Sequence, residues 1–269
     1  MTIRVRAQGY VAIAMTAGLL CVGCTRESVP ATPEARLQQG KDVIQRMSDT
    51  LEKAQAFSVT THETREQAKV AGGQPVPVTL TRLTIVRRPD RLYFKTTGDN
   101  DNEAWYDGIG LTYVAHKDKV FAQARMPETL DRTLDAMSER YNIQVPLADI
   151  LYSKPAHALI ADTTTGGWVG KETVDGQDCD HLAFEDRGVK WEMWVAPDGL
   201  PRRAKAEFPA TRRLRKADVT FSDWNLSPTI DAKRFEPAVP PDYEGIAMIQ
   251  RAAILRNNPD EAVPTGGKK

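Results

Sequence analysis

The sequence predicts an α+β, β-rich fold in which a curved antiparallel sheet packs against helices. Two segments carry apolar residues at helical spacing, and two longer stretches alternate apolar and polar residues with period two. Short turns rich in Asp, Gly and Pro separate the alternating runs. Hairpin-linked strands form antiparallel sheets, which can keep one face apolar. Because the chain shows no repeat at a fixed period and no linker in its middle, we expect a single domain over residues 33–243.

The first expected helix covers residues 33–56. Thr32 can cap it, Pro33 suits the first helical position, and Glu34 suits the positive end of the helix dipole. Its apolar stripe consists of Leu37, Ile44, Met47, Leu51 and Ala54. Such a stripe must pack on another element, most simply on a sheet.

Period-two alternation then predicts a meander of short strands near residues 57–61, 76–86, 92–94, 105–106, 111–115 and 120–121. A helical segment interrupts it, with a second stripe of Leu130, Leu134, Met137 and Tyr141. Two short helical turns, 146–151 and 155–160, each begin with a proline. Five further strands are expected at 168–174, 179–185, 189–195, 202–208 and 214–224. A sheet of about ten strands twists towards closure, so its concave face can meet both helical stripes.

The N-terminus has the pattern of a bacterial lipoprotein signal peptide over residues 1–23. Arg4 and Arg6 precede an apolar run, 10–22, that is too short to span a bilayer. The sequence before Cys24 resembles a lipobox, although Cys21 stands where Leu is usual. We therefore expect lipidation of Cys24 and a flexible tether over 24–32; the alternative is ordinary secretion. Thr25 in place of Asp favours the inner leaflet of the outer membrane over the inner membrane.

Composition limits the class of partner. Removing residues 1–23 from the 269 leaves 34 basic and 36 acidic residues, which argues against a nucleic-acid binder. The mature domain keeps one cysteine, Cys179, so it cannot form an intrachain disulfide. The tail is expected to hold a short amphipathic helix over 246–255 and to be disordered beyond it.

Cys179 and His181 are the pair that best fits an enzyme. Two residues apart on a strand, they share a face, and an imidazole there can activate a thiolate. No glycine-rich elbow adjoins them, so we interpret them as structural and expect no catalytic residue. The four histidines are scattered and no metal-ligand spacing occurs, so we also expect no metal and no cofactor. A cysteine-dependent hydrolase remains the enzyme alternative.

Basic residues gather on two neighbouring expected strands: Arg202, Arg203, Lys205, Arg212, Arg213, Arg215 and Lys216. We favour a charged sheet edge that discourages aggregation. The alternative is contact with anionic lipid headgroups.

Several motifs together resemble a known family. In order along the chain they are Arg87-Arg88-Pro89-Asp90-Arg91-Leu92, Tyr106-Asp107-Gly108, Pro146-Leu147-Ala148-Asp149-Ile150-Leu151-Tyr152, Val169-Gly170, Val174-Asp175-Gly176, Cys179-Asp180-His181-Leu182-Ala183-Phe184 and Ser222-Asp223-Trp224-Asn225. Over residues 40–240 the chain resembles a bacterial family of predicted periplasmic proteins, a domain of unknown function. That family is similar to the LolA–LolB, LppX and RseB group. The resemblance implies a strongly curved antiparallel sheet, an incomplete barrel, with helices packed across its open side over an apolar cavity. It also implies acyl-chain binding or envelope sensing, and no catalytic residues.

These observations favour a periplasmic, lipid-anchored protein that holds a lipid, an acyl chain or another apolar ligand. The expected cavity lining is Leu92, Phe94, Trp105, Tyr113, Phe184, Trp191 and Met193. The same residues could instead meet in a solid core, and alternation does not separate the two outcomes. The alternative function is an envelope sensor or interaction module that binds a protein partner.

Overall fold

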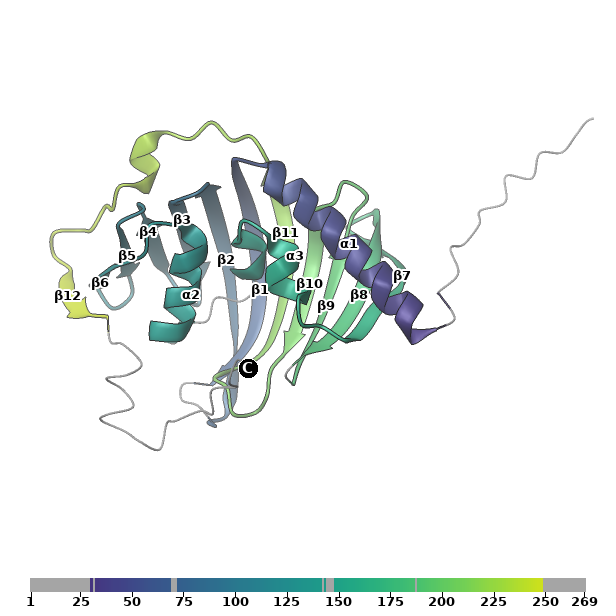
Figure 1. Cartoon of the computed structure of the whole chain (residues 1–269). Coiled ribbons are helices and arrows are strands. Elements are labelled where there is room, and N and C mark those ends of the chain that lie inside the picture. Colours follow the sequence, from purple (N-terminus) through teal and green to yellow (C-terminus); the bar gives the residue numbers. More distant parts are fainter. Residues whose placement is uncertain are drawn as a thin grey trace, which may run out of the picture.

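The computed structural model describes residues 30, 32–68, 72–141, 143, 148–186 and 188–248. Its described strands form one twelve-stranded sheet in the order β12-β6-β5-β4-β3-β2-β1-β11-β10-β9-β8-β7 (Figure 1). Neighbours pair antiparallel, except that β12 runs parallel to β6. The sheet curves and stays open, and the α-helices lie across one face, here called the inner face. The predicted fold class is confirmed.

The strand bounds follow the hairpin turns. They are β1 (Ala56–Ala68), β2 (Pro75–Arg87), β3 (Arg91–Gly98), β4 (Asn102–Tyr106), β5 (Gly110–Ala115), β6 (Val120–Arg125), β7 (Thr165–Val174), β8 (Gln177–Asp186), β9 (Val189–Val195), β10 (Pro201–Glu207), β11 (Leu214–Asn225) and β12 (Glu244–Ala247). Because β1 and β11 pair, the two halves of the chain join in a single sheet. The helices are α1 (Pro33–Lys53), α2 (Leu130–Tyr141), α3 (Pro155–Ile160) and the 3-10 helices η1 (Ala148–Leu151) and η2 (Ala232–Phe235).

The start of α1 follows its cap chemistry. The hydroxyl of Thr32 accepts a hydrogen bond from the Ala35 amide at 3.2 Å, and Pro33 occupies the first turn. The apolar stripe buries Ile44, Met47 and Leu51 completely. The helix lies on β7 and contacts α3. Among the described residues, no helix is long and apolar enough to cross a membrane.

The main core lies between the inner face and the helices. Alternate residues of each strand point into it, such as Phe57 and Val59 of β1 or Leu182 and Phe184 of β8. Arg88 ties η1 to the sheet by donating to the carbonyl oxygens of Leu151 and Tyr152, at 3.1 and 2.8 Å. These hydrogen bonds hold η1 against the inner face of the sheet.

A second cluster lies on the outer face, where the chain after β11 returns across the sheet. Tyr93, Trp105, Val114 and Phe235 are buried there. Tyr93 alternates with the inward residues Leu92 and Phe94, and Trp105 pairs with Tyr93. The expectation that Trp105 lines the inner cavity is therefore wrong.

Two further expectations need correction. Residues 244–247 form β12 rather than part of a helix, and their backbone pairs with β6 from Val120 to Gln123. The basic strands β10 and β11 lie inside the sheet, not at its edge, and Arg203 pairs with Asp218 across them at 2.6 Å. The expected signal peptide, Cys24, most of the tether and the tail from 249 onwards lie outside the described residues.

Candidate functional site

The inner face holds a pocket beneath α3, here called the α3 pocket, with a volume of about 250 Å³. Nine of its thirteen lining residues are apolar: Ala158, Leu159, Val189, Trp191, Ala204, Ala206, Phe208, Ala217 and Val219. The volume is slightly below the usual range for ligand sites, and the apolar lining is typical of them. The pocket therefore suits an apolar group.

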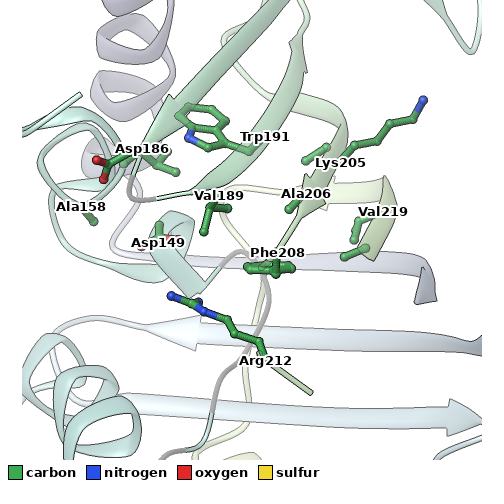
Figure 2. Close-up of a pocket in the computed structure, with 13 residues that line it drawn as sticks. Asp149, Ala158, Asp186, Val189, Trp191, Lys205, Ala206, Phe208, Arg212 and Val219 are labelled. Atoms are coloured by element: carbon green, nitrogen blue, oxygen red, sulfur yellow. The ribbon is translucent and has the colours of Figure 1, made fainter. Parts of the chain in front are cut away.

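Side chains from several elements surround the α3 pocket (Figure 2). Trp191 and Val189 come from the start of β9, and Phe208 follows β10. The guanidinium of Arg212 stacks over the Phe208 ring at 5.6 Å, and the ammonium of Lys205 points away from the other lining residues. The Asp149 carboxyl also lines the pocket, and burial raises its pKa because a desolvated carboxylate is unfavourable.

Two more hollows share lining residues with the α3 pocket. The α2 pocket, of about 40 Å³, lies between the sheet and α2 with η1, and it shares Val219 with the α3 pocket. The rim groove, of about 680 Å³, lies at one end of β1 and β7–β11 and shares Trp191, Ala206 and Ala217 with the α3 pocket. The α3 and α2 pockets lie on the inner face, whereas most of the side chains that line the rim groove, such as Glu192, Lys205 and Asp218, belong to the outer face.

Charged side chains occupy the inner face between these hollows. We call Glu63, Arg65 and Arg82 the buried charge cluster, since their side chains are 4%, 8% and 13% exposed. Glu63 is ion-paired with Arg65 and lies 3.4 Å from Arg82. It also accepts a hydrogen bond from the Thr61 hydroxyl at 2.8 Å. Burial lowers the pKa of the Arg82 guanidinium, and the Glu63 carboxylate opposes that shift. Glu63 and Arg82 line the α2 pocket, whereas Arg65 lines the rim groove.

The residues expected to line a cavity divide among these places. Leu92 and Phe94 line the α2 pocket. Phe184 and Trp191 stack at 4.6 Å between ring centres and line the rim groove, and Trp191 reaches the α3 pocket as well. Tyr113 is half-buried against the main core. Met193 is fully buried within that core.

The sequence prediction did not include the buried charge cluster, although β1 carries a signal for it. Phe57 and Val59 set the inward phase, and the same period-two alternation continues to Thr61, Glu63 and Arg65. A carboxylate and a guanidinium in phase with apolar residues indicate charges that face the inside. Arg82 lies opposite Thr61 on β2 and completes the cluster.

Cys179 and His181 share the outer face, as predicted, but they are not arranged for catalysis. The buried Cys179 thiol donates to the Gln177 carbonyl at 3.5 Å, and burial raises its pKa. The His181 ring stacks on Trp194 at 4.3 Å, and its nitrogens lie 2.7 Å from Glu192 and 3.4 Å from Glu172. A thiol kept protonated, with the imidazole directed at carboxylates, favours the structural interpretation.

The chain is similar to several solved structures at low sequence identity. No curated protein sequence matches the chain significantly. An uncharacterized conserved protein from Thermus thermophilus is 8% identical, with 77% of this chain and 98% of that chain covered and a TM-score of 0.45. The Pseudomonas aeruginosa MucA/MucB complex structure matches at 15% identity, with 74% of this chain and 61% of that chain covered and a TM-score of 0.43. Mycobacterium tuberculosis lipoprotein LppX is 12% identical, with 71% of this chain and 97% of that chain covered and a TM-score of 0.39.

The family model for predicted periplasmic proteins, DUF2092, matches residues 40–249, which is most of the chain. The family expected from the sequence motifs is thereby confirmed. The chain belongs to this family of predicted periplasmic proteins.

Proposed function

We propose that the protein binds an acyl chain or another apolar ligand in the hollows of the inner face. The observation that carries the proposal is the α3 pocket, nine of whose thirteen lining residues are apolar. A ligand of this kind would place its tail beneath α3. Each methylene that leaves water contributes about 0.8 kcal/mol, so a tail of about ten carbons can bind after ordering costs.

Filling the α3 pocket should weaken this binding. We expect Ala206→Trp to weaken binding of an environment-sensitive fatty-acid probe by about tenfold or more, because the indole occupies the space that the tail needs. Fluorescence titration measures the affinity, and Ala232→Trp on the exposed helix η2 is the matched control. Unchanged, saturable binding by folded Ala206→Trp would rule out this pocket as the site.

The alternative is an envelope sensor or interaction module without a small ligand. One observation favours it: β7 is the last strand of the described sheet, and Val169 on it is 44% exposed. An end strand can pair with an extended segment of a partner protein. If no lipid probe binds saturably to the folded protein, the interaction module becomes the better interpretation.

We also propose that a lipid on Cys24 holds the protein in the periplasm, at the inner leaflet of the outer membrane. The short apolar run before Cys24 and the small Gly23 support it. Cell fractionation should find the wild type with the outer membrane and Cys24→Ser in the soluble periplasm. A wild-type protein that is already soluble would contradict the lipid anchor.

A further inference from the structure

The buried charge cluster carries one more positive charge than its own residues neutralise. Arg65 and Arg82 share the single carboxylate of Glu63. Arginine does not lose its proton in proteins, so burial leaves a net charge of +1. Each buried ion costs several kcal/mol of desolvation free energy unless it is fully paired. An anion that enters this space would supply the missing partner.

The donors of the cluster are also not fully used. Among the described residues, no hydrogen-bond acceptor reaches the buried Nε of Arg65. Arg82 donates through Nε to the Thr96 hydroxyl at 3.1 Å and lies over the Phe94 ring at 5.2 Å. The Tyr113 hydroxyl is close enough to Arg82 to feel its charge, and burial raises the pKa of Tyr113, so the hydroxyl stays a donor. Guanidinium and phenol donors together suit a carboxylate or a phosphate.

The cluster lies beside the hollows proposed for the tail. Arg82 and Glu63 line the α2 pocket, which meets the α3 pocket at Val219. Arg65 lines the rim groove. A head at Arg82 and a tail beneath α3 would therefore occupy neighbouring hollows of the inner face.

We propose that the buried charge cluster binds the anionic head of an acyl ligand, a carboxylate or a phosphate, through Arg65 and Arg82. This inference rests on the proposed function and specifies the ligand as an anionic amphiphile. Glu63 is ion-paired with both guanidinium groups, so one surplus positive charge remains for the head of the ligand. Neutral lipids with the same tail bind more weakly because they leave the surplus charge unpaired.

The test compares compounds that share an alkyl tail and differ in the head group. The full chain with Cys24→Ser is used, so that the protein's own acyl groups do not compete. Dodecanol, laurate and dodecyl phosphate each displace the neutral fluorescent probe N-phenyl-1-naphthylamine. Hydrogen bonds to charged groups are strong, so we expect laurate, dodecyl phosphate or both to bind at least about tenfold more tightly than dodecanol. Whichever acid binds more tightly, laurate or dodecyl phosphate, identifies the preferred head group as a carboxylate or a phosphate.

Two variants test whether Arg82 and Arg65 cause the preference for an anionic head. Arg82→Met and Arg65→Met should each remove the advantage of the acids over dodecanol. Arg125→Met, on the exposed end of β6, removes the same charge and should keep the advantage. Two variants are used so that one that fails to fold, by circular dichroism, does not decide the result.

The displacement measurements distinguish a failure of this inference from a failure of the proposed function. Equal affinities for all three compounds, or folded arginine variants that keep the preference, would overturn the anionic head and leave apolar binding intact. If none of the three compounds displaces the probe, the proposed function itself is wrong.

Discussion

Gly40→Ala should destabilise the protein by about 2–3 kcal/mol, the opposite of its effect in an exposed helix. In an exposed helix the change stabilises by up to about 1 kcal/mol, since glycine is the poorer helix former. Here a Cβ on Gly40 would lie 2.7 Å from the Cα of Gly167 and 2.8 Å from the Trp168 nitrogen. These are backbone atoms of β7, so neither can rotate away, and the helix and the strand must separate.

Urea unfolding measures this change in the free energy of unfolding. Gln39→Ala, at the neighbouring half-buried position of α1, is the control and should change stability by less than about 0.5 kcal/mol. An alanine variant as stable as the wild type would mean that α1 does not lie on β7 as closely as the structure shows. Because α1 also contacts α3, the same variant should loosen the cover of the α3 pocket.

The sequence predicted the elements well where one local rule determines them. The start of α1 follows from the cap at Thr32, which is visible in the chain, whereas the helix expected to reach residue 56 ends at Lys53. Most strand positions follow from alternation and from turns such as Asp107-Gly108. Alternation within β8 also separates Cys179 from Leu182 correctly.

The sequence could not show which side of the sheet a given strand face points to, or which segments pair across the sheet. Trp105 alternates with inward residues on β4, and only the pairing of Trp105 with Tyr93 places it on the outer face. The helix expected over 246–255 was predicted from the spacing of Ile246, Ile249 and Ala253, but the edge of β6 offers 244–247 backbone partners that a local pattern does not contain. The buried charge cluster likewise needs Arg82, which only the β1–β2 register brings opposite Thr61.

Glu63→Gln should destabilise the protein by about 3 kcal/mol or more. Glutamine keeps an oxygen that can accept from Thr61, but it leaves Arg65 and Arg82 buried with no opposing charge. Removing one partner of a buried ion pair typically costs about 3–5 kcal/mol because an uncompensated charge remains in a site of low polarity. Here two cations would face each other. Chemical denaturation of the variant, measured beside the wild type, gives the loss directly.

The matched control is the exposed pair on the outer face. Asp218 accepts from Arg203 at 2.6 Å, with side chains 39% and 34% exposed. Solvent screens this pair, so Asp218→Asn should cost less than about 1 kcal/mol. Adding Arg65→Gln to Glu63→Gln returns the cluster to a net charge of +1. The double variant should therefore lose less stability than the sum of the losses of the two single variants. Equal losses for Glu63→Gln and Asp218→Asn would show that Glu63 is solvated, and the charge surplus that an anionic ligand would neutralise would then be absent.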